Sequence, residues 1–141
     1  MHELITKRRV EFSDTDQGGV VHFSRFFIFM ETAEDQFLRA LGSRFDFTHE
    51  GRQGGWPKVS ATCEYLHSAR YGDELEIRLA VLKLTRRTIT YGFSIRRGDL
   101  ELARGRTTSV CCAQKTDGSF EAIAIPAALA GRIEASPGAA E

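Results

Sequence analysis

The chain of 141 residues has few cysteines, the residues that hold very small domains together through disulfides or bound metal ions. Its three cysteines, Cys63, Cys111 and Cys112, are an odd number, and their spacing matches no metal-binding motif. We therefore expect reduced thiols, no disulfide framework and no metal site. Neither link is needed at this length, since such a chain can bury about two-thirds of its unfolded surface in a hydrophobic core.

Net charge and long apolar runs are also absent. Nineteen Lys and Arg balance nineteen Asp and Glu, so no overall positive field would attract nucleic acid or an anionic membrane. No apolar run approaches the roughly 20 residues of a membrane span, and the residues that follow Met1 do not read as a signal peptide. We expect a cytoplasmic protein with neither a nucleic acid nor a membrane as its partner.

Several catalytic motifs are missing as well. The chain has no Gly-x-Ser-x-Gly elbow, no Walker loop, no His-Glu-x-x-His and no Cys-x-x-Cys. These absences weigh against a serine hydrolase and against a metalloenzyme.

The hydrophobic periodicity predicts an α+β domain. Apolar residues recur at helical spacing from Phe23 to Leu41, and Gly42 is placed to end that helix. Beyond Pro57 the apolar positions alternate instead, as they do in half-buried strands. Strand-like segments cover residues 58–67, 75–81, 89–96 and 102–114. The last of them has a face of small residues that would let a helix approach closely: Ala103, Gly105, Thr107 and Ser109.

The remaining segments predict a loop, a C-terminal helix and a short tail. Residues 43–57 show no sustained periodicity and are interpreted as a loop. Pro126 opens an Ala-rich helix expected to reach Glu134, because proline suits the first helical turn. The chain shows no repeat or linker, so we expect one domain over residues 1–135 and a disordered tail over 136–141.

The most informative stretch runs from Val10 to Phe23 and is typical of a strand, an acidic loop and a helix start. It contains Asp14, Asp16 and a Gly-Gly pair. A helix N-terminus has unpaired N–H groups and a partial positive charge, so this loop can direct a carboxylate and backbone donors at one small volume. Such a volume suits attack on a carbonyl.

These residues resemble a known family. The chain resembles the 4-hydroxybenzoyl-CoA thioesterase branch of the hotdog-fold acyl-CoA thioesterases. The resemblance rests on Asp14-Thr15-Asp16, on Gly19-Val20-Val21 and on the aromatic-rich helix that carries Glu31. Residues 65–75 resemble the family's strand-turn-strand element, although Ser68 stands where the family usually has proline. The resemblance implies a curved antiparallel sheet around one long central helix. It also implies a homodimer or homotetramer in which protomers pair edge to edge, with active sites at the interface.

The resemblance also implies catalytic roles. Asp16 matches the catalytic carboxylate, which acts either as the nucleophile or as the general base for water. The backbone amide of Phe23 matches the donor to the thioester oxygen, and Glu31 matches an acid that orients the loop or the substrate. Taken by themselves, Asp14 and Asp16 can simply cap a turn, and Glu31 can be a solvated helix charge. Asp14 is the better candidate for a purely structural role.

Substrate contacts are expected at five positions. Gly19 and Val20 would bring backbone close to the ligand, and His22 would line the pocket. His22 is not expected to act as an acid, because a thiolate leaving group needs little protonation. The resemblance assigns Arg86 and Arg87 to the phosphates of coenzyme A, which suit forked guanidinium donors; a solvated hairpin turn is the alternative.

Together these features predict an acyl-CoA thioesterase that splits an aromatic or short acyl-CoA without a cofactor or metal. Two alternatives stay open. A hotdog-fold enoyl-CoA hydratase is disfavoured because the interval from Asp16 to His22 is one residue too long and lacks Asn-Pro. A protein that binds acyl-CoA or an acyl carrier without catalysis is the second alternative.

Overall fold

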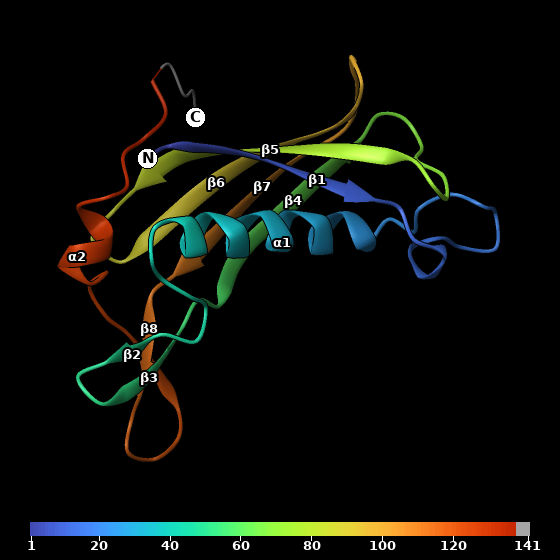
Figure 1. The fold of residues 1–141 in the computed structure, drawn as a ribbon. Helices are drawn as coiled ribbons and strands as arrows, with labels where there is room; N and C mark the ends of the chain where they lie inside the picture. Colours follow the sequence, from blue (N-terminus) through green and yellow to red (C-terminus); the bar gives the residue numbers. More distant parts are fainter. Residues whose placement is uncertain (138–141) are drawn as a thin grey trace.

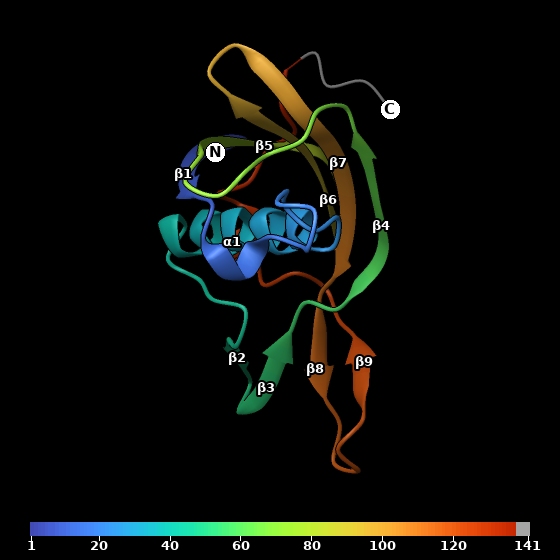
Figure 2. The same ribbon diagram turned by 90° about the vertical axis from the view of Figure 1, so that its right-hand side faces the viewer.

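One long helix, α1, lies across the concave face of an antiparallel sheet in the computed structural model of the protein (Figures 1 and 2). The structure describes residues 1–137. The helices are α1 (Arg25–Ala40) and α2 (Ala127–Ala130), with a 3-10 turn, η1 (Phe12–Asp14). The strands are β1 (Glu3–Arg9), β2 (Thr48–His49), β3 (Arg52–Gly55), β4 (Lys58–Tyr65), β5 (Glu74–Leu84), β6 (Thr88–Arg97), β7 (Leu100–Val110), β8 (Cys112–Gln114) and β9 (Phe120–Ala122). The predicted α+β class is confirmed.

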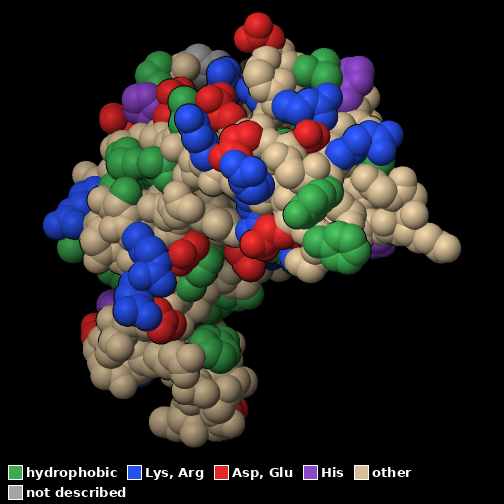
Figure 3. Space-filling model, turned by 45° about the vertical axis from the view of Figure 1, so that its right-hand side comes forward, with side chains coloured by type: hydrophobic (Ala, Val, Ile, Leu, Met, Phe, Trp, Pro, Cys, Tyr) green, Lys and Arg blue, Asp and Glu red, His purple; other side chains and the backbone are tan. Residues whose placement is uncertain are grey.

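The strands form two antiparallel sheets. The larger has the order β1-β5-β6-β7-β4, which leaves β4 at one edge (Figure 2). The smaller has the order β2-β3-β8-β9 and projects from the body as a separate lobe (Figures 2 and 3). On the face drawn in Figure 3, cationic and anionic side chains are interspersed, in keeping with the balanced charge of the chain.

The sheet buries α1 because alternate side chains of each strand face it. The alternating apolar residues predicted for β5 and β6 are all buried: Leu75, Ile77, Leu79, Val81, Ile89, Tyr91, Phe93 and Ile95. They pack against the apolar face of α1, whose residues Phe29, Ala33, Phe37 and Leu38 have no exposed surface. Gly42 ends the helix as predicted, with a φ of 79° and a bond from the Ser43 amide to the Leu38 carbonyl.

The small-residue face of β7 is buried under α1, as the sequence predicted. Gly105 lies so close to the helix that a Cβ atom at this position would be 2.1 Å from Cε of Met30 and 3.2 Å from the Thr62 carbonyl oxygen. Ser109, farther along the same face, donates a hydrogen bond of 2.9 Å to the Glu34 carboxylate. The missing side chain at Gly105 therefore sets how closely helix and sheet approach.

Glu34 is a buried acid that the periodicity did not identify. It lies on the inner face of α1 with no exposed surface, and its carboxylate is paired with the Lys58 ammonium at the start of β4. Burial raises the pKa of Glu34, and the opposing effects of Lys58 and the Ser109 hydroxyl leave it above its ordinary value. This ion pair ties the centre of the helix to the edge strand.

Some sequence predictions were wrong in detail. Residues 43–57 contain two short strands, β2 and β3, which the small sheet pairs although they lack periodicity. The predicted strand over 102–114 is split into β7 and β8 at Cys111, whose amide bonds to the Arg87 carbonyl.

The C-terminal helix, expected to reach Glu134, stops at Ala130. Gly131 follows it, and the Arg132 side chain then reaches the Leu41 carbonyl at 2.7 Å. Ser136, the first residue of the segment expected to be a tail, is buried and donates to Glu3 at 2.7 Å. Residues 138–141 of that segment lie outside the described residues.

We expect the substitution Gly105→Ala to destabilise the protein by about 1–3 kcal/mol, because the new methyl group must displace Met30 in a close-packed core. Urea denaturation would measure this loss. Gly55→Ala is the matched control, since a Cβ there meets only a ring atom of Phe120 at 3.6 Å. Equal stability of the two variants would contradict the close approach at Gly105.

Candidate functional site

The two sequence elements that resemble the thioesterase family lie side by side. The acidic loop closes on itself through a bridge between Thr15 and Val21. It is joined to the second element by a bridge between Val20 and Arg70, and the Val21 amide donates to the Ala69 carbonyl at 2.8 Å. Elements about fifty residues apart in the sequence therefore build one continuous surface beside the start of α1.

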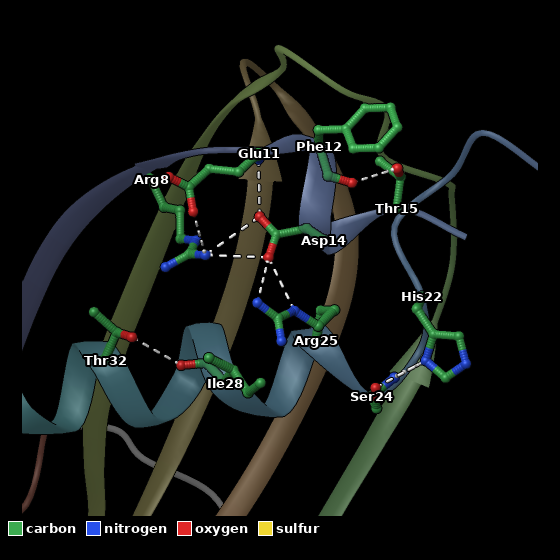
Figure 4. Close-up of polar contacts among 10 residues, drawn as sticks. All are labelled: Arg8, Glu11, Phe12, Asp14, Thr15, His22, Ser24, Arg25, Ile28 and Thr32. Atoms are coloured by element: carbon green, nitrogen blue, oxygen red, sulfur yellow. Dashed lines mark hydrogen bonds and ion pairs between the residues drawn. The ribbon is translucent and has the colours of Figure 1, made fainter. Parts of the chain in front are cut away.

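Asp14 anchors the acidic loop and is fully buried. Its carboxylate accepts bonds from the Glu11 amide at 2.8 Å, from Arg8 on β1 at 3.2 Å and from Arg25 in the first turn of α1 at 2.9 Å (Figure 4). Burial by itself would raise the pKa of Asp14, but the Glu11 amide and the two guanidinium groups together lower it below its ordinary value. The structural role predicted for Asp14 fits this arrangement.

Asp16 lies two residues further on, at the exposed tip of the loop. Its carboxylate oxygen Oδ1 accepts the Gly18 amide at 2.8 Å, and its carbonyl accepts the Gly19 amide at 3.0 Å. Gly19 has a φ of 81°, a left-handed conformation that glycine adopts without strain. Asp16 is thus both a turn former and an exposed acid, and within residues 1–137 no donor contacts its second oxygen, Oδ2.

The backbone at the start of α1 is held on both sides of Phe23. The His22 amide donates to the Asp14 carbonyl at 2.9 Å, and the His22 carbonyl accepts the Arg25 amide at 2.9 Å. In the described part of the chain the Phe23 amide itself has no hydrogen-bond acceptor; Phe23 lies in the turn directly before Ser24, the N-cap of α1. It is a donor available to a ligand.

A cavity of about 370 Å³ joins these groups. It is lined by Asp16, Val20, Val21, Phe23, Phe26, Tyr65, Leu66, His67 and Ser68. The Tyr65 ring packs edge-on against Phe26 at 5.4 Å and Phe23 at 6.4 Å between centroids. The cavity therefore combines a carboxylate and a helix N-terminus with an aromatic wall.

Of the predicted site residues, Asp16, Val20 and Phe23 line the cavity, and three polar lining residues, Tyr65, His67 and Ser68, were not predicted. Tyr65 and His67 come from the end of β4 and the segment after it. The resemblance covered this segment without a role for either residue, because only the folded sheet brings it against the helix start. The one sequence signal for Tyr65 was the alternation of side chains along β4, which places Tyr65 on the same face of the strand as Cys63.

Five predicted site residues are not among those that line the cavity. Gly19 lies in the loop between the lining residues Asp16 and Val20. His22 is exposed outside the lining of the cavity, stacked on Phe23 with its Nδ1 2.8 Å from the Ser24 hydroxyl (Figure 4). Glu31 is exposed on α1. Arg86 and Arg87 are exposed in the turn between β5 and β6, beside α2 and at the opposite end of the sheet from the acidic loop (Figure 1). Within one protomer these arginines are remote from Asp16.

Neither a membrane-spanning helix nor a metal-binding cluster is found among residues 1–137. No helix among residues 1–137 is both long and apolar enough to cross a bilayer. The same residues contain no group of three or more His, Cys, Asp or Glu side chains arranged to hold a metal ion.

The sequence profile of the thioesterase-like superfamily matches residues 10–133, which include the acidic loop and the segment that faces it. The chain belongs to this superfamily. The predicted membership of the acyl-CoA thioesterase family, a family of thioester hydrolases, is thereby confirmed.

Similarities of this chain to individual proteins support the assignment. A putative esterase of Aquifex aeolicus is 34% identical over 106 residues, which are 74% of this chain and 80% of that protein. The acyl-CoA thioesterase YbgC of Haemophilus influenzae is 29% identical over 118 residues, 84% of this chain and 85% of that protein. The structure of 4-hydroxybenzoyl-CoA thioesterase from Pseudomonas sp. strain CBS-3 matches with a TM-score of 0.79 at 20% identity, covering 93% of this chain and 99% of that one. At that identity the match concerns the fold, and the predicted hotdog fold is confirmed.

We expect Asp14→Asn to destabilise the protein by roughly 3 kcal/mol at neutral pH, because it leaves two guanidinium groups without their shared carboxylate. The folded-state pKa of Asp14 lies below the ordinary value of 3.8, so its stabilisation is present above that pH and is lost as the pH falls through the lower folded-state pKa. The difference between the two proteins in urea should therefore persist from pH 7 to about pH 5 and shrink below pH 4.

Asp46→Asn is the control, since Asp46 forms an exposed pair with Arg44, and solvent screening leaves such pairs with little effect on stability. A loss at Asp14 no larger than at Asp46 would contradict the anchoring role.

Proposed function

We propose that the protein hydrolyses an acyl-CoA thioester in the cytoplasm, with Asp16 as the catalytic carboxylate and the Phe23 amide as the donor to the thioester oxygen. The observation that carries this proposal is their shared cavity, which is lined by Asp16, whose carboxylate is exposed, and by Phe23, whose amide has no acceptor among residues 1–137. Removal of one such donor typically costs about 3 kcal/mol in the transition state, so the amide is a substantial part of the mechanism.

The reaction needs only groups of this site and water. If Asp16 acts as the nucleophile, Oδ2 bonds to the thioester carbon, the C–S bond breaks and coenzyme A leaves as the thiolate. Water then cleaves the resulting anhydride and gives the carboxylic acid. If Asp16 acts as the general base, it takes a proton from the water that attacks the same carbon. In both routes the carbonyl oxygen becomes negative and the Phe23 N–H stabilises it. No cofactor or metal takes part in the proposal.

The acyl group would occupy the aromatic part of the cavity. Phe23, Phe26 and Tyr65 form a wall with two edge-on contacts, suited to a flat aromatic or a short aliphatic group. Gly19 and Val20 would form the rim beside Asp16, and His22 would contact the substrate from outside the cavity. Glu31 would orient the loop or the substrate.

A homodimer would bring Arg86 and Arg87 to this site. The outer edge of β4 is unpaired within residues 1–137, and Val59 on it is 64% exposed. Antiparallel pairing of two β4 strands would set the Lys58 end of one beside the Tyr65 end of the other. The Lys58 end adjoins the ends of β7 and β6 and hence the turn that carries the two arginines. A partner's Arg86 and Arg87 would then hold the phosphates of coenzyme A near the cavity.

The hydratase alternative is less well supported. It requires a histidine beside the catalytic loop, and His22 is turned toward Ser24 outside the cavity lining. The binding alternative lacks a use for the exposed Asp16 beside a free amide. Hydrolysis is the reaction that uses both groups.

The test is release of free thiol from a panel of aromatic and aliphatic acyl-CoAs by the natural protein and by Asp16→Asn. We expect turnover by the natural protein and a loss of at least about 100-fold in the variant, since the amide is a poor nucleophile and base. Urea denaturation of both proteins is the control for folding. Equal turnover by the two proteins would exclude Asp16 as the catalyst, and absence of turnover on every substrate would favour the alternatives.

The dimer makes a separate prediction. The molar mass of the protein in solution, measured by light scattering during size exclusion, should be an even multiple of the 15.7 kDa chain. A mass of one chain at the concentration of an active assay would contradict a site that needs arginines from a partner.

A further inference from the structure

Among the described residues that line the cavity, Tyr65 is the one whose side chain forms a hydrogen bond with the backbone at the start of α1. Its hydroxyl donates to the Phe23 carbonyl oxygen at 3.0 Å. Its ring packs against the Phe23 ring at 6.4 Å. Tyr65 comes from the end of β4, so this bond joins the sheet to the helix start across the cavity.

The bond acts on the geometry of the amide that would bind the thioester oxygen. Two peptide planes meet at the Cα atom of Phe23. The plane before it contains the Phe23 N–H and is held through the His22 carbonyl by the Arg25 amide at 2.9 Å. The plane after it contains the Phe23 carbonyl and is held by Tyr65 at 3.0 Å. With both planes fixed, the direction of the free N–H is fixed as well.

The hydroxyl is suited to this task. Burial of the phenol and the neighbouring Cys63 thiol raise the pKa of Tyr65, so the group keeps its proton at neutral pH and remains a donor. The Tyr65 side chain lines the cavity together with Asp16 and Phe23. Preorganised donors stabilise a developing charge more than donors that must first reorient.

We propose that Tyr65 is a positioning residue that aims the Phe23 amide at the thioester oxygen through the Tyr65–Phe23 hydrogen bond. The inference rests on the proposed function, because the amide has this task only in thioester hydrolysis. It assigns Tyr65 no proton transfer and no contact with the reacting atoms.

Tyr65→Phe isolates the hydrogen bond, because it keeps the ring and its contacts with Phe23 and Phe26. We expect kcat/KM to fall three- to tenfold, the factor typical of one lost hydrogen bond, while the preference among acyl groups stays unchanged. Tyr71→Phe is the matched control: Tyr71 is 67% exposed and its ring contacts Phe12. That variant should behave as the natural protein.

Two inhibitors distinguish aiming of the amide from a general structural role. Both carry the acyl group that the panel shows to be turned over fastest. The first replaces the thioester sulfur by CH₂ and keeps the carbonyl, and the second is the thioether that lacks the carbonyl. Tyr65→Phe should weaken binding of the ketone three- to tenfold and leave binding of the thioether unchanged. A loss of general structure would weaken both.

The outcomes separate the two proposals. Turnover that depends on Asp16 but is equal in Tyr65→Phe and the natural protein, with unchanged binding of both inhibitors, would overturn the role of Tyr65 alone. Equal weakening of both inhibitors would also overturn it. Absence of turnover on every acyl-CoA of the panel would overturn the proposed function, and the role of Tyr65 with it.

Discussion

The buried carboxylate of Asp14 is the interaction on which the site depends. It gathers Arg8 from β1, the Glu11 amide from the turn and Arg25 from α1 around one point. Three chain segments that would otherwise vary in their relative position are thereby fixed, and the loop with Asp16 follows two residues later. A charge without exposed surface is tolerated because two cations and an amide surround it. Asp14 therefore fixes the place of Asp16, the carboxylate to which the proposed function assigns catalysis.

The acidic pair divides two tasks between two similar side chains. Asp14 is buried and its charge is paired with Arg8 and Arg25. Asp16 is exposed and keeps one carboxylate oxygen without a donor among the described residues. The same division recurs along α1, where Glu34 is buried against Lys58 and Glu31 is exposed. In each case burial decides whether an acid is paired within the fold or remains exposed to a ligand.

The sequence predicted the large features well because they depend on local patterns. Helical and alternating periodicity identified α1, β5 and β6, and the small residues of β7 predicted the close approach of the helix. Features that depend on tertiary contacts were missed. Glu34 interrupts an apolar face and its burial depends on Lys58, 24 residues away. Tyr65 and His67 join the cavity only because β4 folds back beside the helix start.

The spacing of these contacts along the chain bears on the order in which the protein folds. The bonds of Asp14 to Arg8 and Arg25 span only 6 and 11 residues, so they close short loops. The Tyr65 bond to Phe23 spans 42 residues, and β1 pairs with a strand more than seventy residues later. Contacts between distant residues cost more chain entropy and form more slowly. A partly folded chain can thus hold the acidic loop in shape while the cavity beside it still lacks its second wall, and the appearance of activity during refolding reports completion of the sheet.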